Sequence, residues 1–168
     1  DSRIPTVQVG TPGEDAARRD LTINALFYNM HTKCVEDFTE RGLQDLAAGV
    51  ARTPLPPTVT LLDDPLRSLR ALRFAARLNL TLAPDLAAAL HSADVSAALQ
   101  HKVSRERIGC EVTGLLTCDA DAGVAQSLKT LRDTGLLRVV LDAGVSCQRQ
   151  QTCEPAPPED WVQLGVRV

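Results

Sequence analysis

The chain has 168 residues, enough for one domain or two small ones. Hydrophobic residues make up 44% and charged residues 23%, so the chain can bury a core, and with 3% aromatic residues that core must consist mainly of Leu, Ala and Val. A net charge of −3 argues against a dedicated, strongly basic nucleic-acid binder, although a local cluster of positive charge can override the global balance. No apolar run approaches about 18 residues, so we expect no membrane span.

The cysteines and histidines give no sign of a disulfide framework or a zinc site. The cysteine count is odd, no CxxC pair occurs, and the three histidines do not cluster with the cysteines, which are Cys34, Cys110, Cys118, Cys147 and Cys153. This pattern predicts a reduced intracellular protein. We favour the cytoplasm, with the nucleus and organelles left open. The chain opens with DSRIPTVQVGTP instead of Met, which looks like the interior of a longer protein.

The first 57 residues mix short strands and short helices. Thr11, Pro12 and Glu14 fit a capping box with proline at the first helical position. Alternation and helical spacing predict strands and helices in the order strand Ile4–Val9, helix 14–20, strand Leu26–Asn29, strand Lys33–Phe38 and helix Arg41–Val50. The proline-rich stretch Thr53–Pro57 interrupts regular structure, and we expect a domain boundary there.

After residue 58 the sequence is helical throughout. Asp64 is a natural N-cap and Pro65 a natural first-turn residue, and the expected helices are 64–78, 84–99, 104–116, 120–134 and 136–141. The tail 146–168 has the composition of a loop or disordered segment. We therefore predict an α+β chain with a small α+β part over 1–57, a helical part over 58–145 and a tail.

The stretch LLDDPLRSLRALRFAARL, residues 61–78, combines an apolar helical face with a row of arginines. At about 100° per residue Leu66, Leu69, Leu72 and Ala76 share one face, and a neighbouring stripe holds Arg67, Arg70, Arg73 and Arg77. One interpretation is an ordinary solvated stripe. The other is a clamp for phosphates and base edges, because arginine is always charged and offers a planar fork of donors.

A second polar cluster lies in Ala17–Leu26, ARRDLTINAL. Arg18, Arg19 and Asp20 are adjacent, and Asn24 follows Asp20 by four residues, which places both on one helical face. The plain interpretation is a helix end with an internal ion pair. The functional interpretation is a site where Asp20 and Asn24 face a ribose hydroxyl.

Four segments, in order and correctly spaced over residues 3–116, resemble the CCA-adding tRNA nucleotidyltransferases of the bacterial and eukaryotic class. RRDLTINALFYN resembles the motif R-R-D-[FL]-T-x-N-A-[LM], and VEDFTERGLQDLAAGVART resembles D-x-x-x-G-x-x-D-L-x-x-x-x-x-R, with Asp37, Gly42, Asp45, Leu46 and Arg52 in place. DDPLRSLRALRF resembles the base-reading motif E-D-x-x-R-x-x-R-x-x-R-F with Asp63 in the Glu position, and SRERIGCE resembles the neck motif S-x-E-R-x-x-x-E. Any one motif is weak evidence, but four together are strong.

The resemblance implies a fold and an activity. The fold is the C-terminal part of a nucleotidyltransferase head, or palm, over 1–57, followed by an all-helical neck that selects the nucleotide over 58–145. The activity is template-independent addition of C, C and A to the tRNA 3′ end from CTP and ATP, by attack of the 3′-hydroxyl on the α-phosphate. The partners are therefore CTP, ATP and the tRNA 3′ end, with no membrane.

The resemblance also assigns roles to individual residues. Asp64 and Arg67 pair with the base edge, accepting CTP and ATP and rejecting GTP and UTP. The remaining nucleotide ligands are Arg70 and Arg73 toward the triphosphate, Arg19 with no part of the nucleotide specified, and Asp20 and Asn24 near the ribose. Arg77 lies outside the motif as a solvated charge, and the residues expected to brace the neck helices are Glu106, Arg107 and Glu111.

Catalysis in this family uses two Mg²⁺ ions, which stabilise the attacking and leaving oxygens. Their carboxylates come from a Gly-Gly-x-x-Arg-Asp turn followed by D-x-D, which we expect upstream of residue 1, so no catalytic or metal residue is assigned in this chain. Asp119 and Asp121 have D-x-D spacing but no strand around them, and a rigid metal shell is not expected there. We therefore expect the chain to be a fragment that lacks the catalytic aspartates and is inactive in isolation.

Two other functions stay open. A poly(A) polymerase of the same superfamily shares these motifs but uses ATP alone, and the eukaryote-like RTPLPP favours CCA addition. A non-catalytic helical RNA- or protein-binding fragment is the alternative of another class. Selective binding of CTP and ATP, of ATP alone, or of neither separates the three.

Overall fold

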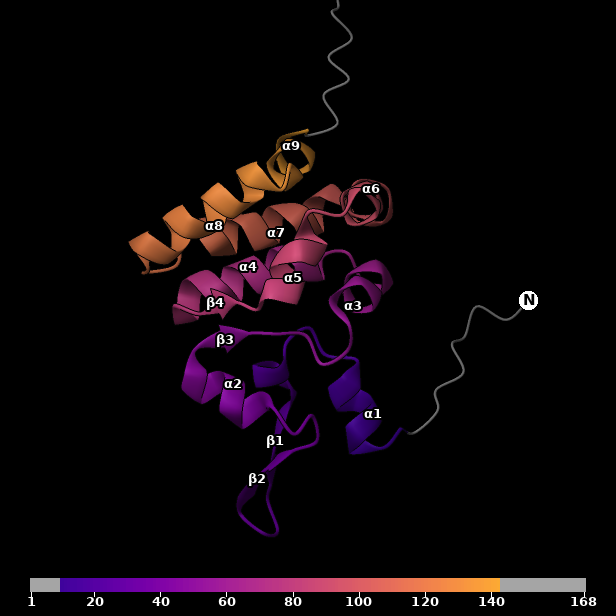
Figure 1. The fold of residues 1–168 in the computed structure, drawn as a ribbon, viewed down its shortest axis with the longest axis vertical. Helices are drawn as coiled ribbons and strands as arrows, with labels where there is room; N and C mark the ends of the chain where they lie inside the picture. The colour runs from indigo at the N-terminus through magenta and orange to yellow at the C-terminus, as the bar shows by residue number, and fades with distance from the viewer. Residues whose placement is uncertain (1–9, 143–168) are drawn as a thin grey trace, which may run out of the picture.

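The structure is a computed structural model that describes residues 10–142 (Figure 1). A small N-terminal part lies at one end and a helical part at the other. The N-terminal part contains α1 (Pro12–Ala17), the 3-10 helix η1 (Thr22–Ala25), β1 (Leu26–Asn29), β2 (Cys34–Asp37), α2 (Gly42–Ala48) and β3 (Val50–Ala51). The helical part contains α3 (Pro57–Asp63), α4 (Arg67–Leu78), β4 (Thr81–Leu82), α5 (Pro84–Leu90), α6 (Ala93–Lys102), α7 (Arg105–Leu116), α8 (Asp121–Asp133) and α9 (Leu136–Leu141).

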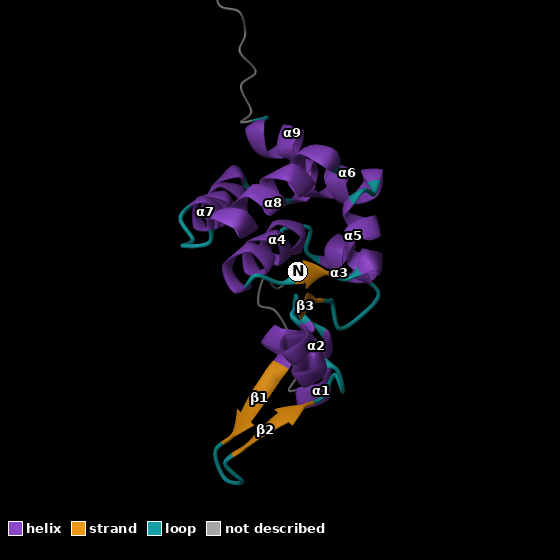
Figure 2. Ribbon diagram, turned by 60° about the vertical axis from the view of Figure 1, so that its left-hand side comes forward, coloured by secondary structure: helices purple, strands orange, loops and turns teal. Residues whose placement is uncertain are grey.

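The described residues are mostly helical with two small sheets, which agrees broadly with the predicted α+β class (Figure 2). β1 and β2 form an antiparallel hairpin that projects from the molecule, with Leu26 opposite Asp37. β3 and β4 pair in parallel, Val50 with Thr81 and Ala51 with Leu82. This pairing was not predicted, and it joins the two sides of the expected boundary at residue 57. The strand expected at Ile4–Val9 and the tail 146–168 lie outside the described residues.

Capping residues mark the starts of α1 and α7, and glycines mark the ends of α2 and α8. At α1, the Thr11 amide donates to Glu14 Oε2 (2.7 Å) and the Glu14 amide donates to Thr11 Oγ1 (3.3 Å), which is the predicted capping box. Ser104 caps α7 by accepting from the Arg107 amide. Gly49 and Gly135 follow α2 and α8 in the left-handed conformation that glycine adopts without strain.

The observed helices differ from the predicted ones at three places. Asp64 ends α3 as its C-cap, because a residue before proline is driven to extended backbone. The turn that follows is closed by hydrogen bonds across three residues, from the Arg67 amide to the Asp64 carbonyl and from the Ser68 amide to the Pro65 carbonyl, and α4 starts at Arg67 instead of Pro65. The unpredicted helix α3 begins at Pro57, which occupies a first-turn position that tolerates proline. The helix expected over 84–99 is two helices, because Ser92 is extended and the chain turns so that both pack on α3.

The core is one contiguous cluster centred on α4, which packs against α7 and α8. The predicted apolar face of α4 is confirmed: the side chains of Leu66, Leu69, Leu72 and Ala76 are buried. Leu61, Leu86, Leu99, Leu131 and Leu136 complete the cluster from neighbouring helices. Because α4 is enclosed by helices on this face, its arginine stripe lies along the seam with its neighbours.

Candidate nucleotide-binding site

Arg67 begins α4 and is held by three hydrogen bonds. Its Nη1 donates to the carbonyl of Thr60 (3.1 Å) and to Asp63 Oδ2 (3.0 Å), and its Nη2 donates to the carbonyl of Arg18 (2.7 Å). The side chain is only 16% exposed. A guanidinium carries five N–H groups, so within residues 10–142 two donors remain for another partner. Arg67 is therefore fixed in place with part of its donor capacity unused.

Arg70 and Arg73 make ion pairs with carboxylates of other elements. Arg70 Nε donates to Asp20 Oδ2 (2.8 Å) and Nη1 donates to Glu111 Oε1 (3.3 Å), while Nη2 lies 2.7 Å from Asp20 Oδ2. Arg73 Nε donates to Glu111 Oε2 at 2.6 Å, and its guanidinium lies 4.4 Å from the Phe74 ring centroid. Glu111 thus connects α7 to α4, which confirms the bracing role expected for it.

The solvated-stripe interpretation therefore holds for Arg77 alone, which is exposed as predicted. Arg73 also crosses α7 closely: a Cβ on Gly114 would lie 2.9 Å from Arg73 Cδ. The absence of a side chain at Gly114 lets Arg73 reach Glu111 over the helix surface.

Asp20 is buried and its carboxylate is already well supplied with donors. Oδ1 accepts from Asn24 Nδ2 (3.0 Å) and from the Leu21 amide (2.9 Å), while Oδ2 accepts from Arg70. Burial alone would raise the pKa of Asp20, but the hydrogen bond from Asn24, the Arg70 charge and the Leu21 amide lower it below its ordinary value. Asp20 therefore stays ionised and positions Arg70 and Asn24, and the Asn24 carbonyl oxygen makes no hydrogen bond within the described residues.

The Asp64 carboxylate accepts two hydrogen bonds, one from a backbone amide and one from an arginine of α7. Its Oδ1 accepts from the Leu66 amide (3.3 Å) and its Oδ2 accepts from Arg107 Nη2 (3.2 Å). Arg107 was expected only to brace the neck, so its contact with a predicted base-reading residue was missed. The i, i+4 spacing of Arg107 and Glu111 predicts that both share one face of α7, but which helix that face meets depends on how α7 packs on α4. Glu106 is exposed and makes no hydrogen bond in the described part of the chain.

Six of the seven predicted ligands line one pocket of about 390 Å³. The lining residues are Arg18, Arg19, Asp20, Asn24, Asp64, Arg67 and Arg70. Arg73 is the predicted ligand that does not line it, and Arg18 is the lining residue that was not predicted. With four arginines and two aspartates the pocket wall is net positive, which favours an anionic ligand.

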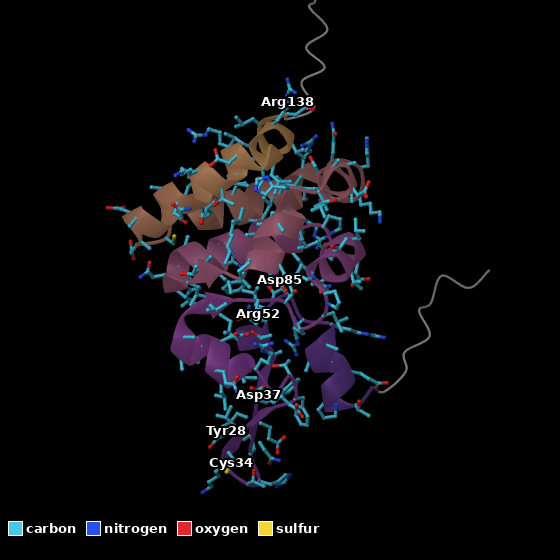
Figure 3. All side chains as sticks on the ribbon, in the orientation of Figure 1. Tyr28, Cys34, Asp37, Arg52, Asp85 and Arg138 are labelled. Carbon is cyan, nitrogen blue, oxygen red and sulfur yellow. The ribbon has the colours of Figure 1, made fainter. Side chains whose placement is uncertain are left out.

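The other matched motif residues hold the N-terminal part together. Asp45 accepts from Thr22 Oγ1 (2.8 Å) and from Arg52 Nε (3.3 Å), and Arg52 also lies 3.8 Å from Asp85 (Figure 3). Asp37 accepts from Thr39 and from the Leu43 amide at the start of α2; burial raises its pKa, but these hydrogen bonds lower it further than burial raises it. These residues support the pocket without lining it.

The residues 10–142 contain no group of three or more His, Cys, Asp or Glu side chains that could hold a metal ion. Asp119 lies in the loop after α7 and Asp121 is the first residue of α8, so this D-x-D is not carried on a strand. The described cysteines, Cys34, Cys110 and Cys118, are free thiols. No helix in the described range is long and apolar enough to cross a bilayer.

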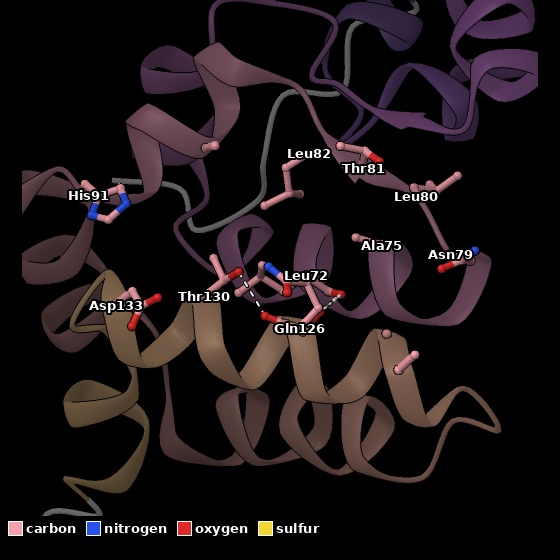
Figure 4. Close-up of a pocket in the computed structure, with 14 residues that line it drawn as sticks. Leu72, Ala75, Asn79, Leu80, Thr81, Leu82, His91, Gln126, Thr130 and Asp133 are labelled. Carbon is pink, nitrogen blue, oxygen red and sulfur yellow. Dashed lines mark hydrogen bonds between the residues drawn. The ribbon is translucent and has the colours of Figure 1, made fainter.

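Another pocket, of about 590 Å³, lies between α4, β4, α5 and α8 (Figure 4). Its lining includes Asn79, Thr81, His91 and Gln126 but none of the seven predicted ligands. The candidate site is therefore identified by its converging charges and not by pocket size.

Known proteins resemble the chain in sequence and structure. A family model described as the Poly A polymerase head domain matches residues 2–52. The mitochondrial CCA tRNA nucleotidyltransferase of Candida glabrata is 56% identical over 116 residues, which are 69% of this chain and 22% of that protein. Its namesake in Saccharomyces cerevisiae is 57% identical over 115 residues, 68% of this chain and 21% of that protein.

Solved structures agree with the sequence comparison. A tRNA nucleotidyltransferase complexed with a primer tRNA and an incoming ATP analog superposes with a TM-score of 0.68 and 33% identity, over 82% of this chain and 39% of that one. The chain spans about a fifth of the length of the two yeast relatives. Because the four motifs, the fold and both comparisons agree, the chain belongs to the CCA tRNA nucleotidyltransferase/poly(A) polymerase family.

Proposed function

We propose that this chain carries the nucleotide-selecting part of an enzyme that adds C, C and A to the 3′ end of tRNA from CTP and ATP. One observation carries the proposal: Arg67 and Asp64 line the same positive pocket, and Arg67 is fixed while two of its N–H donors have no partner in residues 10–142. A carboxylate beside a guanidinium offers an acceptor next to donors. The site can therefore read a base edge that presents the complementary pair.

The chemistry of the bases explains the choice. Cytosine and adenine each present an amino donor beside a ring-nitrogen acceptor on the pairing edge, whereas guanine and uracil present a carbonyl acceptor beside an N–H donor. Asp64 can accept from the amino group of C or A while Arg67 donates to the ring nitrogen. With G or U, acceptor meets acceptor and donor meets donor, which leaves polar groups unpaired in a partly buried site.

The other pocket residues have separate roles in this proposal. Arg18 and Arg19 supply positive charge for the triphosphate, and the Asn24 carbonyl oxygen accepts from a ribose hydroxyl. Arg70 contacts the nucleotide while Asp20 and Glu111 hold it, and Arg73 acts through Glu111. The residues 1–57 and 58–145 then correspond to head and neck, which the β3–β4 pairing joins.

The Mg²⁺ ions of this chemistry are not assigned to the described residues, since these do not provide a ligand group. We place those ligands elsewhere in the protein and assign no step to them here. The tRNA 3′ end is the proposed acceptor, as in the related structure with a primer tRNA and an ATP analog. An intracellular location stays part of the proposal.

A poly(A) polymerase is the second candidate, because the matching family model carries that name. Such an enzyme would bind ATP and not CTP. A non-catalytic binding fragment would bind neither with selectivity. Asp64 and Arg67, which line the same pocket, suit both C and A, and for that reason we favour CCA addition.

Equilibrium binding of CTP, ATP, GTP and UTP tests the proposal, with circular dichroism to verify folding of each variant. The chain should bind CTP and ATP more tightly than GTP and UTP by about tenfold or more, the discrimination typical of a bidentate contact. Arg67→Ala should abolish this preference. Arg77→Ala, on the exposed part of the same helix, is the matched control and should bind as the unmodified chain does. Equal binding of all four nucleotides by the folded chain would refute the proposal.

A further inference from the structure

The pocket of about 590 Å³ between α4, β4, α5 and α8 has no role in the proposed function (Figure 4). It exists because its walls pack in different directions. α8 lies directly on α4 at Gly123, where a Cβ would be 2.5 Å from the Ala76 carbonyl oxygen. α5, on the other side, packs on α3 and α6. A space therefore remains between α8 and the stretch of chain that runs from the end of α4 into α5.

The pocket combines an aliphatic floor with hydrogen-bond acceptors at its rim. Leu72 belongs to the core, and Leu80 and Leu82 pack against it while they line the pocket. On α8, Gln126 makes no side-chain hydrogen bond within residues 10–142, and Asp133 accepts there only at Oδ1, from the neighbouring arginine. An apolar floor with acceptors at the rim suits a flat apolar group that carries one N–H donor.

The only tryptophan of the chain, Trp161, is a group of this kind. It begins the segment 161–168, WVQLGVRV, in which five of the eight residues are large and apolar. In residues 143–160, by contrast, Val145 is the only large aliphatic or aromatic residue. A tryptophan side chain can bury about 150–250 Å² of surface, and its indole N–H needs an acceptor when it does so. Trp161 is therefore stabilised by an apolar pocket with an acceptor at its rim.

Trp161 can reach the pocket from the end of the described chain. The described residues end just after α9 at Asp142, whose Oδ2 accepts from Gln100 (3.3 Å). α9 packs on α8, and α8, with 13 residues, is about 20 Å long. Trp161 follows Asp142 by 19 residues, which span up to about 60 Å when extended. The prediction of a loop for 146–160 is compatible with this, since those residues serve as the connection.

We propose that the pocket holds Trp161 of the same chain, with the indole ring on the aliphatic floor and its N–H directed to an acceptor of α8. The segment 161–168 thereby fastens the end of the chain to α4, β4 and α8. Covalent attachment favours this occupant over a free ligand, because a short flexible connection gives an effective concentration on the order of millimolar. The inference does not depend on the proposed function, since none of the seven predicted nucleotide ligands lines this pocket.

Fluorescence of the whole chain is the first measurement, because Trp161 is its only tryptophan. Acrylamide should quench the folded chain several-fold less than the urea-unfolded chain. Thr130→Arg places a long charged side chain in the pocket and should restore the quenching of the unfolded state. Ala125→Arg, at an exposed position of α8 that does not line the pocket, is the matched control and should stay protected. Circular dichroism verifies that each variant folds. Equal quenching of folded and unfolded chain, or protection that Thr130→Arg leaves intact, would overturn the inference.

Methyl NMR spectra of the chain labelled with ¹³C at Leu and Val locate the indole ring. In Trp161→Ala the methyl signals of Leu80 and Leu82 should shift, because the ring current of the indole is lost, while those of Val35 on the β1–β2 hairpin should not. Protection of Trp161 from acrylamide without these shifts would place the ring elsewhere and overturn the inference. Protection that disappears on dilution would also overturn it, because a second copy of the chain would then supply the tryptophan.

Discussion

Glu111→Ala tests whether the ion pairs between α4 and α7 support the candidate site. The Glu111 side chain is 11% exposed and accepts from Arg73 at 2.6 Å and from Arg70 at 3.3 Å. Its removal leaves two guanidinium groups in the seam without this partner. Arg70 keeps Asp20, but Arg73 has no other carboxylate within salt-bridge distance in residues 10–142.

The size of the effect follows from these contacts. A hydrogen bond to a charged group is worth about 1.5–3 kcal/mol, and the short bond to Arg73, a side chain 18% exposed, should contribute near the lower end of that range. Arg70 is 34% exposed and its Glu111 contact is longer, so solvent reduces that contribution to about 0.5 kcal/mol. We expect Glu111→Ala to lower the free energy of unfolding by about 2–3 kcal/mol.

Urea unfolding at pH 7, followed by circular dichroism, measures this loss. At a slope of about 2 kcal/mol per molar urea, the midpoint should fall by about 1 M. Glu106→Ala is the matched control, since Glu106 lies on the same helix, is exposed and makes no hydrogen bond in the described part, and it should change stability by less than about 0.5 kcal/mol. A loss below about 1 kcal/mol for Glu111→Ala would refute the view that these ion pairs hold the two helices together.

Three further predictions concern other contacts. The pKa of Asp20 is lower in the folded chain than in the unfolded one, so the ionised carboxylate stabilises the fold. This contribution is complete above about pH 4 and is lost as the pH falls through the folded pKa. In Asp20→Asn, the midpoint of urea unfolding should therefore change less between about pH 5 and 2 than in the unmodified chain. Gly42→Ala should lower the free energy of unfolding in urea by about 2 kcal/mol, since its Cβ would lie 2.6 Å from the Thr22 carbonyl oxygen. A Cβ on Gly109 would meet no atom of the described residues within 4 Å, so Gly109→Ala should stabilise α7 by about 0.5–1 kcal/mol. Arg107→Ala should weaken CTP and ATP binding about twofold to fivefold by freeing Asp64, as expected of a half-exposed ion pair, with partial recovery in Arg107→Lys.

Local sequence patterns predicted the elements that depend on nearby residues. The apolar face of α4 followed from its 3.6-residue period, and the starts of α1, α7 and α9 followed from caps and a glycine, whereas α1 ends at Ala17 and not at residue 20. Contacts between distant segments were not readable in the same way. The two-residue strands β3 and β4 pair over thirty positions apart, and two residues carry too little alternation to be recognised as a strand.

The candidate site shows the same division. The spacing in the motifs singled out residues that the fold brings to one pocket, because Asp20 and Arg70 are joined across 50 positions by an ion pair. Their partners were not visible in the sequence: nothing local indicates that Glu111 receives two arginines of α4, or that Arg107 reaches Asp64. Those contacts depend on how α7 packs on α4, which is a property of the core.

The arginine row of α4 can be understood from this packing. Each arginine meets a different environment because successive positions turn around the helix and advance along it: Arg67 meets backbone carbonyls, Arg70 and Arg73 meet carboxylates, and Arg77 meets solvent. Arg67 is held by three partners, two of them backbone carbonyls, and keeps two N–H donors without a partner in residues 10–142, whereas Arg70 and Arg73 are committed to carboxylates. A group that is immobilised before the ligand arrives loses little conformational entropy on binding, and it cannot turn to suit a mismatched partner. Under the proposed function, the ion pairs farther along the helix support selectivity at its first turn by holding α4 against α7, which carries Arg107, the partner of Asp64.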